Sequence, residues 1–242
     1  MYFTTQKDTI FHTLFSTLHD IDYESFIFKI TPDNIHIQST DVAKISILDI
    51  LIDKKYFNEY NVNKSCIIDL DINIINKICK IFNKKYDLKF EIKSNYLYIE
   101  SIRNTENDVI KKFRVNTNYI DDNDLIDISK LIIKNKYEID TKIFNNICSE
   151  LSVFSDDINI TLNSKNMCFS TSHDLGDIQY FLDNIKSNEN INISCKIKFL
   201  VKFKLLNLFD SINFNIDNEK PLLLNLKNSD ININYLIAPN YT

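Results

Sequence analysis

The chain has 242 residues, a formal net charge of -5 and 44% hydrophobic residues. That length can form one large domain or two domains of roughly 120 residues, each with its own core. The composition excludes a disulfide-stapled miniprotein and a Pro/Gly-rich disordered chain. Because there is a single glycine, the composition also excludes a glycine-rich loop that cradles phosphate.

The residue usage is typical of a protein in a reducing, aqueous compartment. Isoleucine, asparagine and lysine dominate, as an AT-rich genome would produce, so the asparagines do not indicate a low-complexity segment. The five cysteines contain no C-x-x-C spacing, which favours reduced core thiols. The N-terminus lacks a signal-peptide pattern, and no apolar stretch approaches the roughly 20 residues that span a bilayer. We therefore expect a soluble intracellular protein.

The first half of the chain is predicted to open with a helix. Apolar residues at helical spacing predict helices over 8–19 and 72–82. Alternating apolar residues predict strands, with Asn/Asp turns between them. In chain order these strands cover residues 25–31, 35–39, 42–52, 66–71, 88–92, 96–100 and 112–119.

The second half has the same order of elements. Helices are predicted over 141–152 and 203–212 by the same apolar spacing. Strands are predicted over 158–162, 167–170, 178–182, 191–199, 212–216, 222–226 and 231–237. A helix followed by two strands thus recurs at an offset close to half the chain, which indicates an internal repeat.

We therefore predict an α+β fold with two similar domains, each an antiparallel sheet with two helices on one face. The domains are expected at 1–118 and 132–242. The connector is expected at 119–131, where four aspartates cluster. These aspartates are Asp121, Asp122, Asp124 and Asp127.

The polar faces of the predicted helices suggest a polyanionic partner. On a helical wheel these faces collect five lysines and few acids, although acids outnumber bases in the whole chain. Such segregation suits contact with the phosphates of nucleic acid. No base-reading motif is present, so the contact would be weak and independent of base sequence. The lysines are Lys77, Lys80, Lys84, Lys142 and Lys204.

Several segments resemble a known family. Residues 34–48 are similar to the signature G-V-x-L-Q-x-M-D-x-S-H-V-x-L-V of DNA sliding clamps of the proliferating cell nuclear antigen type, and an F-x-x-Y element follows at Phe57 to Tyr60. Gly176 and the two residues after it resemble the family's G-x-I strand entry. Residues 221–224 resemble its P-L-x-V strand, and residues 231–239 its L-x-Y-Y-L-A-P-K ending. The motifs span the chain in the family's order.

The resemblance implies a homotrimeric ring around duplex DNA, with helices lining the hole and sheets outside. Ring closure would pair an edge strand at 111–119 with the strand at 177–183 of the next subunit. The resemblance assigns this subunit interface to Lys111, Lys112, Arg114, Asp177, Ile178 and Tyr180. Opposite charges on the two strands make self-pairing plausible.

The resemblance further implies a protein that is not an enzyme and needs no cofactor. A separate clamp loader would use ATP to open the ring, and the clamp would work in the nucleus or wherever DNA is replicated. DNA polymerase and other partners would insert apolar side chains of a short peptide beside the connector. By position, the peptide pocket would use Thr40, Lys44, Ile126, Ile128, Pro221, Leu236, Ala238 and Pro239.

Some residues depart from the family pattern, and other readings stay open. Thr40 replaces a methionine, Lys44 a histidine, Leu236 an aromatic residue and Asn240 a lysine. The chain could instead be a subunit of a heterotrimeric checkpoint ring, or a virus-type processivity factor that forms no ring. Ile126 and Ile128 could simply pack on the domain.

Other kinds of site lack support in the sequence. His12 and His19 share a helix arc but have no ligand partners in sequence to suggest a metal site. The aspartates of the connector lack the glycine and terminal glutamate of a calcium loop. No nucleophile motif of a hydrolase occurs, so an enzyme is disfavoured.

Overall fold

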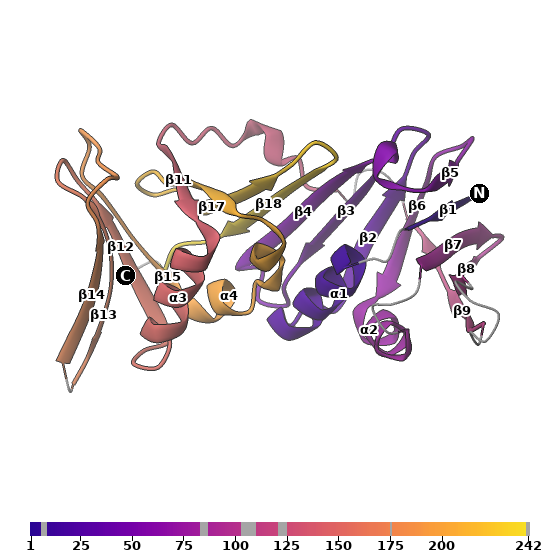
Figure 1. The fold of residues 1–242 in the computed structure, drawn as a ribbon, viewed down its shortest axis with the longest axis horizontal. Coiled ribbons are helices and arrows are strands. Elements are labelled where there is room, and N and C mark those ends of the chain that lie inside the picture. Colours follow the sequence, from indigo (N-terminus) through magenta and orange to yellow (C-terminus); the bar gives the residue numbers. More distant parts are fainter. Residues whose placement is uncertain (6–8, 83–86, 103–109, 121–124, 175, 241–242) are drawn as a thin grey trace. The chain divides into compact units, whose positions relative to one another are not determined.

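The computed structural model describes residues 1–5, 9–82, 87–102, 110–120, 125–174 and 176–240 (Figure 1). The chain forms two compact units that exchange short segments. Unit 1 comprises Met1–Val42, Leu48–Asp127 and Lys227–Ile233. Unit 2 comprises Ala43–Ile47, Ile128–Leu226 and Asn234–Thr242. Strands β4 (Ser46–Asp53) and β18 (Ile231–Ile237) therefore each contribute residues to both units.

Unit 1 contains two antiparallel sheets and two helices, α1 (Thr9–Ile21) and α2 (Ile72–Ile81), which lie side by side (Figure 1). One sheet has the order β5-β1-β7-β8-β9, and the other runs β10-β6-β2-β3-β4. The strands are β1 (Tyr2–Thr4), β2 (Ser25–Ile30), β3 (Asn34–Thr40), β5 (Glu59–Asn61), β6 (Cys66–Asp71), β7 (Asp87–Lys93), β8 (Tyr96–Ile102), β9 (Lys112–Asn116) and β10 (Asn118–Tyr119).

Unit 2 is built from the same kinds of elements. Its sheets have the orders β14-β13-β12-β15 and β18-β17-β16-β11, and its helices are α3 (Thr141–Leu151) and α4 (Ile197–Val201). The strands are β11 (Lys136–Asp140), β12 (Asp157–Leu162), β13 (Met167–His173), β14 (Gly176–Leu182), β15 (Ile191–Lys196), β16 (Ser211–Asn215) and β17 (Leu222–Lys227).

Strand pairing confirms the predicted repeat. In unit 1 the strand before α1 pairs with β7, and β2 pairs with both β3 and β6. In unit 2 the strand before α3 pairs with β16, and β12 pairs with both β13 and β15. All of these pairs are antiparallel, so the two halves share one topology and the α+β prediction holds.

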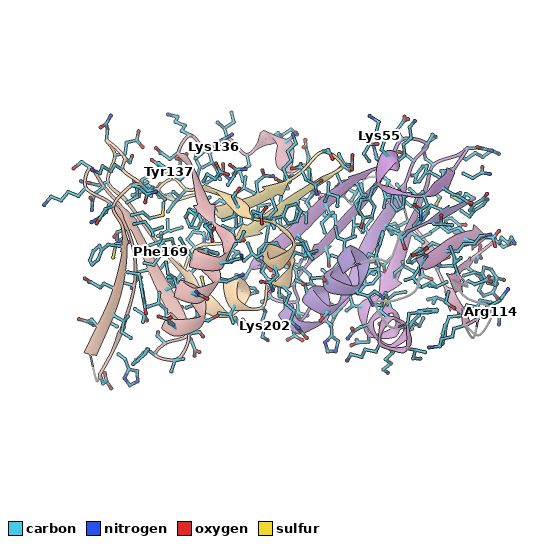
Figure 2. All side chains as sticks on the ribbon, viewed as in Figure 1. Lys55, Arg114, Lys136, Tyr137, Phe169 and Lys202 are labelled. Atoms are coloured by element: carbon cyan, nitrogen blue, oxygen red, sulfur yellow. The ribbon has the colours of Figure 1, made fainter. Side chains whose placement is uncertain are left out.

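Each unit has its own aromatic core. In unit 1, Phe3 of β1 stacks on Phe90 of β7 with ring centroids 5.0 Å apart. In unit 2, Phe144 of α3, Phe169 of β13 and Phe214 of β16 form a triangle of edge-to-face contacts at 5.7–5.9 Å (Figure 2). Such contacts orient rings as well as burying them. In unit 2 these contacts hold α3 against β13 and β16.

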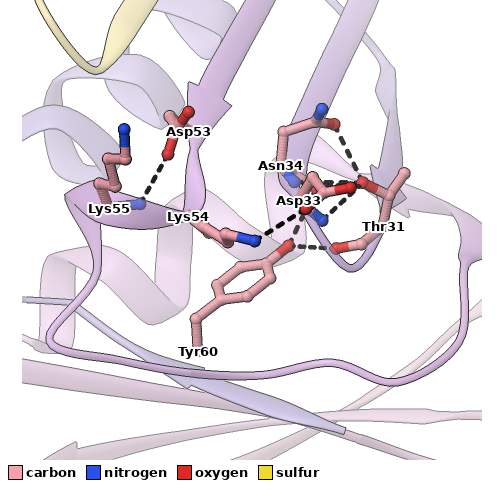
Figure 3. A network of polar contacts seen from close by, with 7 residues as sticks. All are labelled: Thr31, Asp33, Asn34, Asp53, Lys54, Lys55 and Tyr60. Carbon is pink, nitrogen blue, oxygen red and sulfur yellow. Dashed lines mark hydrogen bonds and ion pairs between the residues drawn. The ribbon is translucent and has the colours of Figure 1, made fainter.

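A polar network in unit 1 holds the β2–β3 turn (Figure 3). The Tyr60 hydroxyl donates to the carbonyl of Thr31 at 2.6 Å, and Lys54 Nζ lies 2.8 Å from the Asp33 carboxylate. Burial, and then the charge of Asp33, raise the pKa of Tyr60, so its hydroxyl remains a donor. This network ties the turn to the segment that leads into β5.

The predicted helix over 203–212 is wrong. The chain instead leaves β15 directly into α4, makes a short 3-10 helix at Lys204–Leu208, and enters β16 at Ser211. Neither helix has a side-chain cap at its N-terminus, so the usual start signal is missing. The strand predicted over 191–199 is consequently too long at its C-terminal end.

Two strand predictions also need correction. The strand predicted over 42–52 begins only at Ser46, because residues before it form a turn in which Lys44 has a φ of 55°. The strand predicted over 112–119 is divided, with β9 paired to β8 and β10 paired to β6. The strands β1, β5 and β11 were not predicted; β1 and β5 have three residues each, too few to show alternation.

The apolar helix faces are narrower than predicted. The helical periods that predict α2 and α3 include Ile74, Ile81 and Ile143 on their apolar faces, but these side chains are exposed. The buried face of α2 instead includes Ile72, Ile75, Ile78 and Cys79. The three exposed isoleucines lie at the flank of the core-facing stripe rather than within it.

All five cysteines are free thiols, and four of them are buried. Burial raises the pKa of Cys195 to about 12, so this thiol stays protonated and unreactive. The prediction of reduced core thiols is confirmed for these four. Among the described residues, no helix has the length and apolar character required to cross a membrane.

Candidate functional site

The lysines of α2 and α3 lie on exposed helix faces. Lys77 and Lys80 are exposed on α2, and Lys142 is exposed on the first turn of α3. Lys204 is also exposed, although it begins a 3-10 helix rather than lying on an α-helix. Lys84 lies outside the described residues. Four of the five predicted lysines are thus solvent-exposed.

The N-termini of α2 and α3 are capped by the chain itself. Asp71 accepts a hydrogen bond from the N–H of Ile74 at 3.1 Å. Asp140 accepts from the N–H groups of Lys142 and Ile143 at 2.8 and 3.0 Å. A carboxylate already occupies the place where a phosphate would otherwise bind at each helix end. Any phosphate contact on these helices must therefore come from side chains.

Strand β9 forms one open edge in unit 1. Among the described residues it pairs with β8 alone. Its basic side chains already have partners: Lys112 pairs with Glu100 at 3.0 Å, and the Arg114 guanidinium lies 4.7 Å from the Tyr96 ring centroid (Figure 2 shows Arg114). Lys111 Nζ donates to a backbone carbonyl of α2 at 2.9 Å. These contacts hold the basic side chains near the edge.

Strand β14 forms the corresponding open edge in unit 2. Within the described part of the chain its one strand partner is β13. Asp177 is exposed and Ile178 is half-buried, while the Tyr180 hydroxyl donates to the carboxylate of Glu150 on α3. Phe181 is 53% exposed on this strand. An aromatic ring exposed on an open strand edge is typical of a contact surface.

Further apolar side chains are exposed close to these edges in sequence. In unit 1 they are Ile81 of α2 and Ile110 just before β9. In unit 2 they include Val153 and Phe154, which directly follow α3. The exposure of these side chains was not expected from the sequence, whereas the alternating pattern of β14 does place Phe181 outward.

The residues assigned to the peptide pocket fall in both units. In unit 1, Thr40 ends β3 and Ile126 is 45% exposed. In unit 2, Lys44 is exposed and Leu236 is buried, and the remaining members are half-buried. Those members are Ile128, Pro221, Ala238 and Pro239. The N–H of Ala238 donates to the carbonyl of Ile45 at 2.8 Å, which holds this segment in unit 2.

Asn240 fastens the end of β18 to the rest of unit 2. Its N–H donates to the carbonyl of Ser194 at 2.7 Å, and its side-chain amide donates to Asp157 Oδ1 at 2.7 Å. Asp157 also pairs with Lys196 at 2.8 Å. The residue that departs from the family's lysine therefore has a structural role of its own.

Asp217 anchors the segment that leads into β11. Its carboxylate accepts hydrogen bonds from the N–H groups of Lys134 and Asn135 at 3.0 and 3.2 Å, and from Lys220 Nζ at 2.9 Å. Burial would raise its pKa, but these bonds outweigh burial and lower the pKa to about 2. The sequence analysis did not single out this residue, because nothing local distinguishes it from other aspartates.

The histidines of α1 do not form a metal site in the described structure. His12 is buried, whereas His19 is exposed and contacts Asp20 at 3.3 Å. Within the described ranges, no group of three or more His, Cys, Asp or Glu side chains could hold a metal ion. Asp121, Asp122 and Asp124 lie outside those ranges.

Comparison with known proteins agrees with this architecture. The family model for the N-terminal domain of proliferating cell nuclear antigen matches residues 3–126, just over half of the chain. The chain belongs to the proliferating cell nuclear antigen family. As a member of this family it is a DNA sliding clamp, a processivity factor of DNA replication.

The similarity to relatives and solved structures extends beyond residues 3–126, to most or all of the chain. The proliferating cell nuclear antigen of Dictyostelium discoideum is 23% identical, covering 89% of this chain and 90% of its own. Proliferating cell nuclear antigen 2 of Plasmodium falciparum is 32% identical over 31% of this chain and 28% of its own. The Entamoeba histolytica antigen structure superposes with a TM-score of 0.85 at 18% identity, covering 99% of this chain and 98% of that one. A chain of the PCNA2–PCNA3 complex of Sulfolobus tokodaii gives 0.84 at 19% identity, covering 99% of both.

Proposed function

We propose that this clamp acts as a homotrimeric ring around duplex DNA. The observation that carries the proposal is that each unit has an antiparallel sheet that ends in an open edge strand, β9 in unit 1 and β14 in unit 2. Two different edges on one chain allow a head-to-tail contact between copies. A head-to-tail contact that closes makes a ring rather than a filament.

The side chains near the two edges support self-pairing. The β9 edge carries Lys112 and Arg114, and β14 carries Asp177, so opposite charges would face each other. Exposed apolar groups occur near both edges, including Ile110 in unit 1 and Phe181 in unit 2. An interface of this kind would have an apolar centre and a charged rim.

The exposed lysines support a sliding contact with DNA. Lys77 and Lys80 on α2 and Lys142 on α3 would contact phosphates through their side chains. The N-termini of both helices are already capped by aspartates, so they would not bind phosphate themselves. Few lysines give weak and salt-sensitive binding that does not depend on base sequence. Such binding lets the ring slide while topology keeps it on the DNA.

The partner peptides are proposed to bind at the positions assigned by family resemblance. Ile126 and Ile128 would offer apolar contacts from the connector, and Pro221, Ala238 and Pro239 would offer contacts from unit 2, with Thr40, Lys44 and Leu236 beside them. The Ile126 side chain is 45% exposed, so a peptide could reach it. DNA polymerase and other replication proteins are the proposed peptide donors.

The proposed action is mechanical rather than chemical. The clamp would link polymerase to DNA without catalysing a reaction or holding a cofactor, and a separate loader would supply ATP hydrolysis to open the ring. Its proposed place is the site of DNA replication, which is the nucleus in a eukaryotic cell.

Two measurements test the ring. Light scattering should give a mass of roughly three times 28.5 kDa at micromolar concentration. Loaded clamp should stay on closed circular DNA and be lost once the circle is cut. A monomer mass without any crosslinked trimer would contradict the ring and favour the alternative of a processivity factor that forms no ring. A trimer formed only with a second, different chain would favour a heteromeric ring.

A further inference from the structure

Gln38 is buried on the face of its strand where polar side chains are expected. In β3, Ile35 and Ile37 point into the core of unit 1, so His36 and Gln38 lie on the opposite face. Gln38 is nevertheless only 2% exposed. The backbone of Ile126, 88 residues further along the chain, lies against it. A buried amide requires partners for its donors and its acceptor.

The Gln38 side chain binds both polar groups of the Ile126 backbone. Its Nε2 donates to the Ile126 carbonyl at 2.9 Å, and its Oε1 accepts from the Ile126 N–H at 2.7 Å. These are the two bonds that the opposite residue of a neighbouring antiparallel strand makes in a hydrogen-bonded pair. The side-chain amide of Gln38 thus takes the place of a neighbouring strand's backbone and holds the connector at Ile126.

Asp49 sets the orientation of that amide. Its Oδ1 accepts from Gln38 Nε2 at 2.9 Å, and a carboxylate can only accept, so the nitrogen of Gln38 must face it. With the nitrogen placed there, Oε1 is left for the Ile126 N–H. The same Asp49 oxygen lies 2.5 Å from His36 Nε2, which must carry the proton in this contact. Asp49 is itself 7% exposed.

We propose that Gln38 is a positioning residue for partner peptides, with Asp49 acting behind it. The inference rests on the proposed peptide site at the connector. Because both backbone groups of Ile126 are held, its exposed side chain is presented in one place before a peptide arrives. A contact group that is ordered in advance loses less conformational freedom on binding, so the affinity is higher.

The test combines amide hydrogen exchange at Ile126 with peptide binding, both on the full chain. The probe is a fluorescein-labelled amphipathic peptide with one isoleucine and two phenylalanines on a single helical turn, followed by anisotropy. The variants are Gln38→Ala, Gln38→Glu and Asp49→Asn. Gln38→Glu keeps the size but cannot donate to the Ile126 carbonyl, and its charge faces Asp49. The Asp49→Asn substitution leaves Gln38 and Ile126 unaltered, but it no longer fixes which end of the Gln38 amide faces residue 49.

Ser39→Ala is the matched control. Ser39 is the next residue of β3 and is also buried, and its hydroxyl donates to the Ser25 carbonyl rather than to the connector. Gln38→Ala should speed exchange at Ile126 at least about tenfold, since both hydrogen bonds to the Ile126 backbone are lost, and Gln38→Glu should speed it less, since its carboxylate can still accept from the Ile126 N–H. Peptide affinity should fall about fivefold or more in both, and less in Asp49→Asn, while Ser39→Ala should leave both readouts unchanged.

Four distinct results would overturn the proposal. An unprotected Ile126 amide in the unaltered chain would show that the anchor does not exist. Faster exchange in the Gln38 variants with unchanged peptide affinity would show an anchor that has no positioning role. Equal changes of exchange and affinity in Ser39→Ala would show that the effect is not specific to Gln38. A probe that fails to bind even the unaltered chain, with Ile126 still protected, would place the failure in the proposed peptide site.

Discussion

Replacing Asp217 with asparagine should destabilise the clamp by an amount that depends on pH. Asp217 is 7% exposed, and its two carboxylate oxygens face donors on both sides. One oxygen accepts from the N–H of Lys134 and from Lys220 Nζ, and the other accepts from Asn135. An asparagine side chain would turn its NH2 group toward one of these donor sets. No orientation of the amide therefore satisfies both sides.

The magnitude follows from the pKa of Asp217. Burial alone would raise this pKa, but the hydrogen bonds from Lys134, Lys220 and Asn135 lower it from 3.8 to about 2. At about 1.4 kcal/mol per pKa unit, the ionised carboxylate adds about 2 kcal/mol to the free energy of unfolding. Because the folded pKa lies below the unfolded one, this contribution is complete above about pH 5 and is lost as the pH falls through 3.8 toward 2.

Urea unfolding of Asp217→Asn and the unaltered chain, at one fixed protomer concentration, measures the effect. The difference in free energy of unfolding should be about 2 kcal/mol at pH 7 and should shrink steadily below pH 4. The matched control is Asp210→Asn, an exposed position in the same unit. A difference below about 0.5 kcal/mol at pH 7, or one that stays constant down to pH 2.5, would refute the reasoning.

Three predictions address the proposed surfaces. Changing Lys77 and Lys80 together to alanine should weaken retention on circular DNA and lower the salt slope by nearly two, at about 0.9 per phosphate contact, with the trimer intact; an unchanged slope would remove both lysines from the DNA contact. Phe181→Asp should shift the mass toward monomer, since a charge would have to be desolvated in the interface; an unaltered trimer would place the subunit contact elsewhere. Ile128→Ala should lower the affinity for the labelled apolar peptide at least about fivefold, because a contact side chain is truncated; equal affinity would exclude Ile128 from the site.

The elements that sequence reasoning predicted well are those with strong local signals. The helices expected over 72–82 and 141–152 appear as α2 and α3 with starts at the predicted residues. Both begin immediately after a capping aspartate, Asp71 or Asp140, and both carry a clear apolar period. Where such signals were missing, as between β15 and β16, the assignment failed.

The candidate site was predictable only in its local parts. The exposed lysines of α2 and α3 follow from the helical period, because a residue's face depends on its neighbours in the same helix. The anchors at Gln38 and Asp217 had no such signal. Each depends on a hydrogen bond between residues more than 80 positions apart in the chain. Asp217 is one of 33 acids, and nothing local shows which of them will meet a backbone from elsewhere.

The sequence by itself determined the α+β class, the internal repeat and the charge of the helix faces, because periodicity and residue type act over a few neighbouring positions. The tertiary structure decided which strand edges stay open, which isoleucines remain exposed and how the connector is held. Those features arise when distant segments approach, and a buried amide or carboxylate is stable only where that approach supplies its hydrogen-bond partners. Gln38 against Ile126 is the clearest case in this clamp.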